Sequence, residues 1–596
     1  MKIKKIISTV LIFALILNIT ACQYSNPAVS TNTPRTTTTA YQTTPKATAT
    51  QPSTSTPSPT PVPTPKPEMV TYPIEIGYIK GQNSTYGTAA GKGSHEKGND
   101  KLKEITFEAT PKDGCGFLYW SSDTKGQTIY SYYNPYTYST EAEPVPLYPV
   151  FIKGTQKVAL KDKAVKAVVE EQLGKSTYTY ADLQKIEELD LGINSPQTAE
   201  DFVYFYSLKG LYIHPDKDYF DISPIANLVN ITNISLGVKL ISTLPFENYK
   251  NLKNLYMEYS GEDASSLVKN KDTLESLTLA FSNIKKFEFL SEMHCLKRLN
   301  LTDTVIKESD LDYLPPSLEY LRLDGCENVK DYSRLERLPN LTELGISSSW
   351  VSDITSIGKL KHLKELFAGG NYITDVSPLA RLTNLEDLDI GLNRITDLSP
   401  LKSFFAKSDT EIILELNPIK DYSFLYDYYP CKFYGIVPNE KLAEAVEVAK
   451  DMVKELIKPN MSDYDKYKAL AIGLCDKVNY DYAGEEERRY DLYGTLVKGL
   501  AVCSGYMEAY MMLCTMAGLP CYWIFGLGAG GPHGWNIVKL DGKYYHVDTT
   551  WMDVDVPDKI FMEYFMKSDE FFLMDHSDFN RAPDLICNDT SRDGDV

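Results

Sequence analysis

The sequence has little cysteine, no excess of positive charge and almost no long apolar run, and each shortage excludes a class of protein. Ten cysteines in 596 residues are too few for a small scaffold held together by disulfides. A formal net charge of −19 argues against a general nucleic-acid-binding protein, which needs a basic surface for phosphate groups. Because the sequence has no zinc-ligand spacing, phosphate-binding loop or dinucleotide fingerprint, it predicts neither a metal site nor a cofactor.

Several folded domains are nevertheless expected. Hydrophobic residues make up 43% of the chain, which is enough to form more than one buried core. At roughly 150 residues per domain, the length predicts about four units. Composition divides the chain into a signal at 1–22, a stalk at 23–70, a β-rich module at 71–154, a repeat region at 155–432 and a final domain at 433–596.

The N-terminal segment has the pattern of an export signal. Lysines at positions 2, 4 and 5 precede an apolar run from Ile6 to Leu17, which is shorter than a membrane-spanning helix of about 20 residues. The segment Ile19-Thr20-Ala21-Cys22 resembles the lipobox of bacterial lipoproteins. This resemblance implies that Cys22 carries lipid and anchors the chain on the extracellular face of the bacterial cell membrane. An ordinary secretory signal with an incidental cysteine is the alternative.

The stalk, residues 23–70, is rich in threonine, serine and proline and has no acidic residue before Glu68. Such a composition cannot bury enough apolar surface to fold, and its prolines favour an extended chain. We therefore expect a disordered spacer between the lipid anchor and the folded domains.

Short alternating segments between turn signals indicate a small β-rich module in residues 71–154. The expected strands are Tyr72–Ile79, Ile105–Ala109, Phe117–Trp120 and Val145–Phe151. The stretch from Thr106 to Gly114 and the aromatic residues after it resemble a bacterial surface repeat that occurs beside internalin-type proteins. A tyrosine cluster in this module could bind sugars, although packing between strands is the favoured interpretation. The cluster consists of Tyr130, Tyr132, Tyr133, Tyr136 and Tyr138.

An apolar residue recurs every 21 to 24 positions in residues 155–432. The positions are Leu189, Leu211, Ile234, Leu255, Leu277, Leu299, Leu321, Leu344, Leu366, Leu388 and Ile412. The pattern resembles the leucine-rich repeat of bacterial internalins, which implies a horseshoe-shaped solenoid with one parallel strand per repeat. Asn371 and Asn393 are placed to cap backbone groups in the turns, and an amphipathic helix from Asp162 to Leu173 is placed to cover the first repeat.

The residue between the paired apolar positions of each strand is expected to face the concave side of the solenoid. These residues include Tyr212, Tyr256, Arg322 and Phe367, which we predict to bind a protein ligand. Asn300 and Asp389 occupy the same position in other repeats. A scaffold whose concave face binds nothing is the alternative.

In the final domain, the sequence predicts helices at Glu440–Ile457, from Ser462 to Val478, and from Cys503 until Gly518 ends the pattern. Cys503 therefore lies in the first turn of a buried helix. The unpaired N–H groups and the dipole of such a helix favour a thiolate there, and they are placed to stabilise an oxyanion.

Downstream, Asp541-Gly542 indicates a tight hairpin. With a two-residue turn Leu540 pairs with Lys543, and the same register places His533 and Asp548 on one face as diagonal neighbours. A β-bulge would change this register. The arrangement favours nucleophilic catalysis, in which Cys503 attacks a carbonyl, His533 transfers the proton and Asp548 orients the imidazole.

Three motifs in this domain resemble the transglutaminase-like superfamily. They are Gly499-Leu500-Ala501-Val502-Cys503-Ser504-Gly505-Tyr506, His533-Gly534-Trp535-Asn536 and Tyr545-His546-Val547-Asp548-Thr549-Thr550-Trp551, and the tail through Asp575-His576 fits as well. The resemblance implies a papain-like α+β fold and thiol acyl transfer that leads to cross-linking, deamidation or peptide cleavage. Weaker candidates near the site are Tyr480, Tyr482, Trp535 and His546, for which packing is the default interpretation.

These observations predict a multidomain surface protein in which the solenoid presents a cysteine acyltransferase or hydrolase to protein or peptide substrates. Two alternatives stay open. One is an adhesion protein whose transglutaminase-like domain is not catalytic, and the other is binding of cell-wall carbohydrate by the tyrosine-rich module.

Overall fold

The computed structural model describes residues 68–595, except for 100, 193–195, 215–220, 240–243, 245, 259–260, 406–410, 415, 421–431, 434–438, 485, 487, 530, 554–559 and 582–583. The predicted signal, Cys22 and almost all of the stalk therefore lie outside the described residues. Within the described part, no helix combines the length and the apolar character needed to cross a lipid bilayer.

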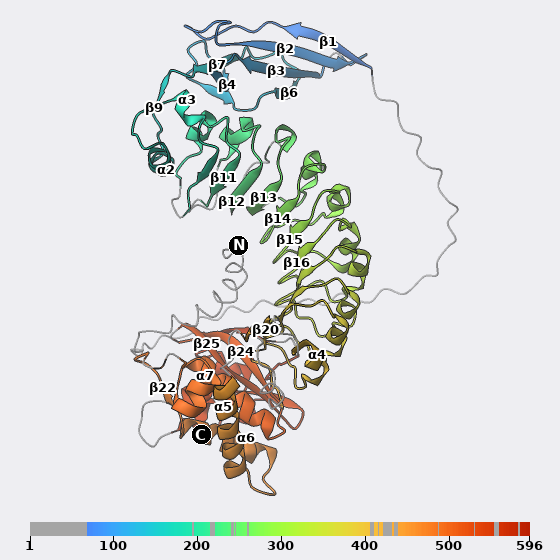
Figure 1. The fold of residues 1–596 in the computed structure, drawn as a ribbon, viewed down its shortest axis with the longest axis vertical. Coiled ribbons are helices and arrows are strands. Elements are labelled where there is room, and N and C mark those ends of the chain that lie inside the picture. The colour runs from blue at the N-terminus through green and yellow to red at the C-terminus, as the bar shows by residue number, and fades with distance from the viewer. Residues whose placement is uncertain are drawn as a thin grey trace, which may run out of the picture.

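Two small antiparallel sheets form the N-terminal module, in the orders β1-β2-β3-β6 and β5-β4-β7 (Figure 1). The strands are β1 (Met69–Ile74), β2 (Gly87–Glu96), β3 (Lys103–Pro111), β4 (Cys115–Ser121), β5 (Ile129–Ser131), β6 (Tyr136–Thr140) and β7 (Tyr148–Lys153). Phe107, Trp120 and Phe151 are buried in one core that both sheets share. The sequence did not predict β2, because its glycines and lysine give no apolar alternation; the strand instead pairs with β1 and β3 on either side.

Three of the five tyrosines in this cluster pack on one another. The Tyr130 and Tyr136 ring centroids are 5.8 Å apart, and those of Tyr136 and Tyr138 are 5.5 Å apart. These contacts agree with the packing interpretation. Sugar binding by the cluster stays a prediction.

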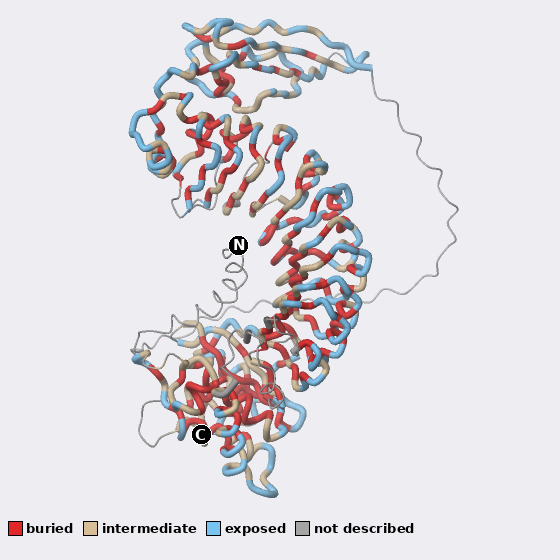
Figure 2. The backbone as a smooth tube through the Cα atoms, in the orientation of Figure 1, coloured by how far each residue is buried: buried red, intermediate tan, exposed pale blue. Residues whose placement is uncertain are grey.

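The repeat region forms one parallel sheet, which confirms the predicted solenoid (Figure 1). Among the described residues its strands are β10 (Glu188–Asp190), β11 (Gly210–Ile213), β12 (Asn233–Lys239), β13 (Asn254–Glu258), β14 (Ser276–Thr278), β15 (Arg298–Asn300), β16 (Tyr320–Arg322), β17 (Glu343–Gly345), β18 (Glu365–Phe367), β19 (Asp387–Asp389), β20 (Glu411–Ile413) and β21 (Lys432–Phe433). The predicted apolar positions pair with one another in register from Leu189 to Ile412. They form a continuous buried band along the arc (Figure 2).

Short 3-10 helices carry the chain back between strands. They are η1 (Glu200–Tyr204), η2 (Ser223–Asn227), η3 (Phe246–Asn248), η4 (Ser265–Asn270), η5 (Glu288–Glu292), η6 (Glu308–Tyr313), η7 (Ser333–Arg337), η8 (Ile357–Lys359), η9 (Ser377–Arg381) and η10 (Ser399–Leu401), with α4 (Lys402–Phe405) after the last. Asn371 caps the turns as predicted, because its amide donates to the Ile346 carbonyl at 2.9 Å and accepts from Val351 N–H at 2.9 Å. Asn393 and Asn417 make equivalent bonds one and two repeats later.

A helix covers the N-terminal end of the solenoid, as predicted. It is α2 (Lys163–Leu173), capped by the Asp162 carboxylate and ended by Gly174, whose φ of 64° is left-handed. Val165 and Val169 on its inner stripe are fully buried in the solenoid core. The short elements around it are β8 (Lys157–Val158), β9 (Tyr178–Thr179) and α3 (Tyr180–Leu183).

In the C-terminal domain, helices pack against an antiparallel sheet whose strands lie in the order β27-β26-β25-β24-β28. The helices are α5 (Asn439–Leu456), α6 (Asp463–Cys475), α7 (Cys503–Met516), α8 (Thr549–Met552) and α9 (Asp569–Phe572), with short helical turns η12 (Gly494–Lys498) and η13 (Met562–Tyr564). The strands are β24 (Cys521–Gly528), β25 (Gly531–Leu540), β26 (Lys543–Val547), β27 (Phe565–Lys567) and β28 (Ser577–Asn580), with a separate pair β22 (Asn479–Tyr480) and β23 (Leu500–Ala501). Helix α7 contacts β25 on one side and α5 and α6 on the other.

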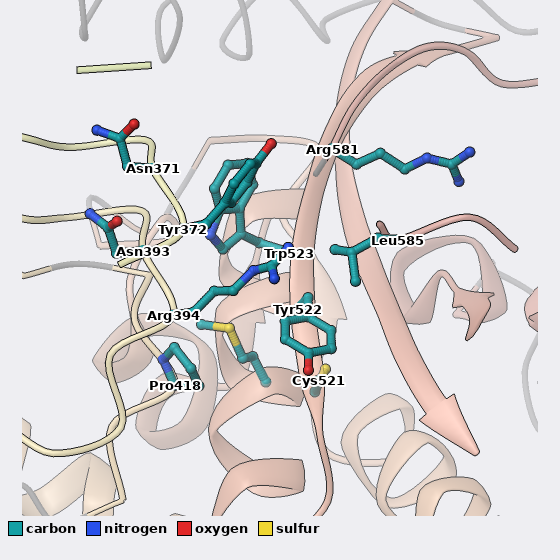
Figure 3. Close-up of a pocket in the computed structure, with 11 residues that line it drawn as sticks. Asn371, Tyr372, Asn393, Arg394, Pro418, Cys521, Tyr522, Trp523, Arg581 and Leu585 are labelled. Carbon is teal, nitrogen blue, oxygen red and sulfur yellow. The ribbon is translucent and has the colours of Figure 1, made fainter. Parts of the chain in front are cut away.

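Arg394 joins the last repeats to the C-terminal domain. Its guanidinium lies 4.6 Å from the Tyr372 ring of the solenoid and 5.1 Å from the Tyr522 ring of β24. It also donates to the Asp584 carboxylate at 3.1 Å. Figure 3 shows Tyr372, Arg394 and Tyr522 at a small crevice between the two regions.

Candidate active site

Cys503 is the first residue of α7 and is only 1% exposed. The N–H groups of the first helical turn have no partner inside the helix, so their dipoles converge near this residue. The helix is held firmly behind it, because Tyr506 and Tyr510 are fully buried. Asn536 donates to the Met507 carbonyl at 3.0 Å and ties α7 to β25.

The predicted hairpin positions the other two residues. Leu540 pairs with Lys543, and the turn residues Asp541 and Gly542 have φ values of 50° and 81°, as a tight two-residue turn requires. Asp548 directly follows β26 and caps α8 by accepting the N–H groups of Thr550 and Trp551 at 3.0 and 3.1 Å.

The Asp548 carboxylate contacts the imidazole of His533, which lies on β25. His533 Nε2 donates to Asp548 Oδ2 at 2.7 Å, and both side chains are almost completely buried. The predicted diagonal placement therefore brings them into direct contact. Two backbone N–H groups on Oδ1 and one imidazole on Oδ2 fix the orientation of the carboxylate.

The three groups also influence one another electrostatically. Burial alone would lower the pKa of His533, but the Asp548 carboxylate and the Cys503 side chain together raise it well above its usual value. Burial alone would raise the pKa of Asp548, yet the neighbouring imidazoles hold it well below its usual range. Since Nε2 of His533 is used by Asp548, Nδ1 is the nitrogen available to the Cys503 sulfur. A charged imidazole between a sulfur and a carboxylate is the arrangement that a thiolate nucleophile requires.

A second histidine–carboxylate pair lies behind the first. His546 Nε2 donates to Asp569 Oδ1 at 2.8 Å, and its Nδ1 accepts the Trp535 indole N–H at 2.9 Å. Arg581 ion-pairs with the same carboxylate and donates to its Oδ2 at 2.6 Å. The Trp535 ring stacks on His533 with centroids 5.6 Å apart, so the second pair supports the wall behind the reactive imidazole. His546 and Trp535 thus have the packing role that the sequence suggested.

One residue at the site was not predicted individually. His576 is fully buried, and its Nδ1 lies 2.6 Å from Asp575 Oδ1 while its Nε2 lies 3.4 Å from Asp548 Oδ2. The distance between Asp548 and a histidine 28 positions later could not be predicted, because no single element joins the two residues. The only available signal was the Asp575-His576 pair in the tail that follows the three motifs.

Among the residues that the structure describes, two groups of side chains come close enough together to hold a metal ion: His533 with Asp548 and His576, and His546 with Asp569 and Cys587. In each group the nitrogen and oxygen atoms already hydrogen bond one another. In the second group Arg581 supplies a cation, and burial raises the pKa of the Cys587 thiol far above its ordinary value, which opposes a thiolate ligand. We therefore assign no metal to either group.

Other predicted residues lie away from this site or outside the described residues. Cys22 lies outside the described residues. On the solenoid, Tyr212 and Tyr256 are partly exposed in β11 and β13. Arg322 is 6% exposed, because its guanidinium crosses Gly345 and lies 3.9 Å from the Phe367 ring. Ligand binding by this face stays a prediction, and Arg322 is already held by contacts within the solenoid.

Tyr480 and Tyr482 form an aromatic pair with ring centroids 4.6 Å apart, and Tyr482 is 62% exposed. Through β22, Tyr480 pairs with Ala501, two residues before Cys503. The pair is therefore available at the surface near the start of α7. The eight described cysteines are all free thiols, including the neighbouring Cys514 and Cys521.

Comparison with protein families identifies two parts of the chain. Residues 450–549 match the model of the transglutaminase-like superfamily, and residues 361–403 match the model for two copies of a leucine-rich repeat. The first match includes Cys503, His533 and Asp548. The chain thus combines a transglutaminase-like domain with leucine-rich repeats.

Curated relatives match a short part of the chain. Kyphoscoliosis peptidase of Homo sapiens is 25% identical over 141 residues, which is 21% of this chain and 21% of that protein. The Mus musculus protein of the same name is 25% identical over 158 residues, which is 23% of this chain and 24% of that protein. The chain therefore spans less than a quarter of the length of these relatives.

Among solved structures, an internalin (InlF) of Listeria monocytogenes is 23% identical, with a TM-score of 0.35, over 46% of this chain and 96% of that chain. A structure described as a TGase is 21% identical, with a TM-score of 0.19, over 22% of this chain and 37% of that chain.

Proposed function

We propose that the C-terminal domain is a cysteine-dependent acyltransferase or hydrolase that acts on protein or peptide substrates, and that the solenoid binds those substrates or a protein that carries them. The observation that carries this proposal is the buried His533 imidazole, which hydrogen bonds Asp548 at 2.7 Å and whose pKa is raised in part by the Cys503 side chain at the start of α7. The peptidase name of the curated relatives supports the same class of chemistry.

The proposed reaction begins with attack of the Cys503 thiolate on a carbonyl carbon. The developing oxyanion is stabilised by the first-turn N–H groups of α7. The imidazolium of His533 gives its proton to the leaving amine, and a thioester forms on Cys503. Water or a second amine then attacks the thioester, with His533 as general base. Water gives hydrolysis or deamidation, and an amine gives cross-linking.

The substrate-binding role of the solenoid and the location of the protein belong to the same proposal. Export by the N-terminal segment and lipid attachment at Cys22 would hold the protein on the outer face of a bacterial membrane. The stalk would then carry the folded domains away from the lipid. Labelling of the protein with a radioactive fatty acid in a bacterial host, and loss of the label in Cys22→Ala, would test the anchor.

The catalytic proposal predicts that Cys503→Ala removes activity. Purified protein is assayed for amine incorporation into glutamine-containing proteins and for peptide hydrolysis. We expect the variant to lose at least about 1,000-fold in rate, because no other group supplies the nucleophile. Cys514→Ala, which removes a buried thiol elsewhere on the same helix, is the matched control.

A substrate-independent measurement complements this assay. Iodoacetamide should alkylate Cys503 faster near neutral pH than the exposed thiol Cys295, because a thiolate and not a thiol reacts. Mass spectrometry of the two peptides gives both rates in one sample. Equal activity of wild type and Cys503→Ala, together with slow alkylation of Cys503, would refute the proposal and favour an adhesion protein.

A further inference from the structure

The Asp548 carboxylate serves two imidazoles. His533 donates to its Oδ2 at 2.7 Å, and His576 Nε2 lies 3.4 Å from the same oxygen. The two rings have centroids 5.6 Å apart, and all three side chains are almost completely buried. A charge on His576 therefore acts on His533 through a medium that screens it poorly.

The surroundings of His576 favour its protonated form. Its Nδ1 faces Asp575 Oδ1 at 2.6 Å and its Nε2 faces Asp548 Oδ2. A carboxylate oxygen can only accept, and a neutral imidazole has a single N–H, so both contacts are satisfied only by an imidazolium. Burial and the nearby His533 lower the pKa of His576, but Asp548 and Asp575 together raise it above its usual value.

Few other ionisable groups face His576 in the described residues. On its own segment Asp575 is adjacent, and its Oδ2 accepts the Tyr564 hydroxyl at 2.9 Å. From the hairpin come Asp548 and His533. Aromatic rings also surround it, among them those of Trp535, Trp551 and Phe572, with centroids 4.8, 4.2 and 4.6 Å away. The cation is thus enclosed by two carboxylates and an aromatic wall.

We propose that His576 is a positioning residue of the reaction, a buried imidazolium that bridges Asp575 and Asp548 and offsets part of the negative charge that Asp548 presents to His533. This inference rests on the proposed function. With the offset in place, the local potential near the Cys503 sulfur is more positive, which favours the thiolate over the thiol. His576 also contacts Oδ2, the oxygen that His533 uses, so that Asp548 keeps its orientation when His533 loses its proton.

The test measures the pH dependence of Cys503 alkylation by iodoacetamide in the full-length protein. His576→Gln keeps a donor near Asp548 but removes the charge. We expect the midpoint for thiolate formation to rise by about one pH unit, so that the rate one unit below the wild-type midpoint falls several-fold. A purely structural role would lower the rate at every pH and leave the midpoint where it was, and an unchanged midpoint overturns the inference.

His546→Gln is the matched control, because it also removes a buried imidazole that contacts Trp535 but one that bears no charge. We expect the wild-type midpoint in this variant. Circular dichroism and thermal unfolding establish that each variant is folded. Should His576→Gln not fold, His576→Asn, which is smaller and keeps a donor toward Asp575, takes its place.

The protonation state of His576 can also be measured in the wild-type protein, without any substitution. With nitrogen-15 histidine, the imidazole of His576 should show two ring N–H protons at pH 7.5, as an imidazolium does. A single N–H would overturn the inference. The two proposals fail in different ways: slow alkylation of Cys503 in the wild type refutes the catalytic function, whereas fast alkylation with the same midpoint in His576→Gln refutes only the role of His576.

Discussion

His533 and His546 lie on adjacent strands, and each donates to a carboxylate at nearly the same distance, 2.7 Å to Asp548 and 2.8 Å to Asp569. Their pKa values nevertheless move in opposite directions. The pKa of His533 is raised well above its usual value, whereas burial lowers the pKa of His546 to about 4. A carboxylate neighbour alone therefore does not determine the charge of a buried histidine.

The difference arises from what else each partner contacts. Asp569 is also paired with Arg581, whose positive charge offsets the carboxylate and so reduces the amount by which Asp569 raises the pKa of His546. Nδ1 of His546 accepts the Trp535 N–H, so protonation of that nitrogen would break a hydrogen bond and bring two donors together. His533 has no such obstacle, because its second nitrogen is available to the Cys503 sulfur, whose contact raises its pKa. One pair is thus arranged for proton transfer and the other for rigidity.

The largest expected effect is a difference in activity between variants of the two carboxylates, Asp548 and Asp569. Asp548→Asn should lower kcat/KM for hydrolysis or amine incorporation by about 100- to 10,000-fold, because an amide neither stabilises the imidazolium nor fixes its tautomer. Asp569→Asn should change kcat/KM by less than about threefold, since its charge is already offset by Arg581. Steady-state kinetics of both variants on one substrate provides the comparison. Equal losses in the two variants would mean that both pairs take part in the chemistry.

Part of this site could be predicted from the sequence, because the relevant signals are local. A helix that begins at Cys503 and a two-residue turn at Asp541-Gly542 determine where the nucleophile lies and which residues face one another across the hairpin. The repeat period likewise fixed the register of the solenoid, since a shift by one residue would expose every core leucine.

The contacts that the sequence did not reveal join separate elements. His576 reaches Asp548 from a different segment, and Arg581 reaches Asp569 from beyond β28. No periodicity encodes such distances. The same holds for Arg322, which the pattern placed on the concave face but which is held there by Phe367 two strands away. Strand β2 was missed for another reason, because pairing on both sides compensates for its weak apolar pattern.

The stability of the folded protein should depend on pH through His546. The unfolded chain binds a proton at His546 below about pH 6.5, while the folded protein resists it until about pH 4. Stability should therefore fall as the pH decreases through this window, by on the order of 3 kcal/mol from this residue. His546→Gln should remove that part of the decrease. Urea unfolding at pH 7, 5.5 and 4.5 measures it, and an identical pH dependence in both proteins would contradict the assigned neutral state.

The smallest effect tests why His546 is neutral. Arg581→Met removes the cation that offsets Asp569, so the carboxylate should raise the pKa of His546 from about 4 by about one unit. A proton NMR titration of the imidazole ring gives the value. An unchanged pKa would assign the neutral state to burial and the Trp535 donor, and Trp535→Phe should then produce the increase. Because Trp535 also stacks on His533, only the Arg581 variant changes the second pair without disturbing the first.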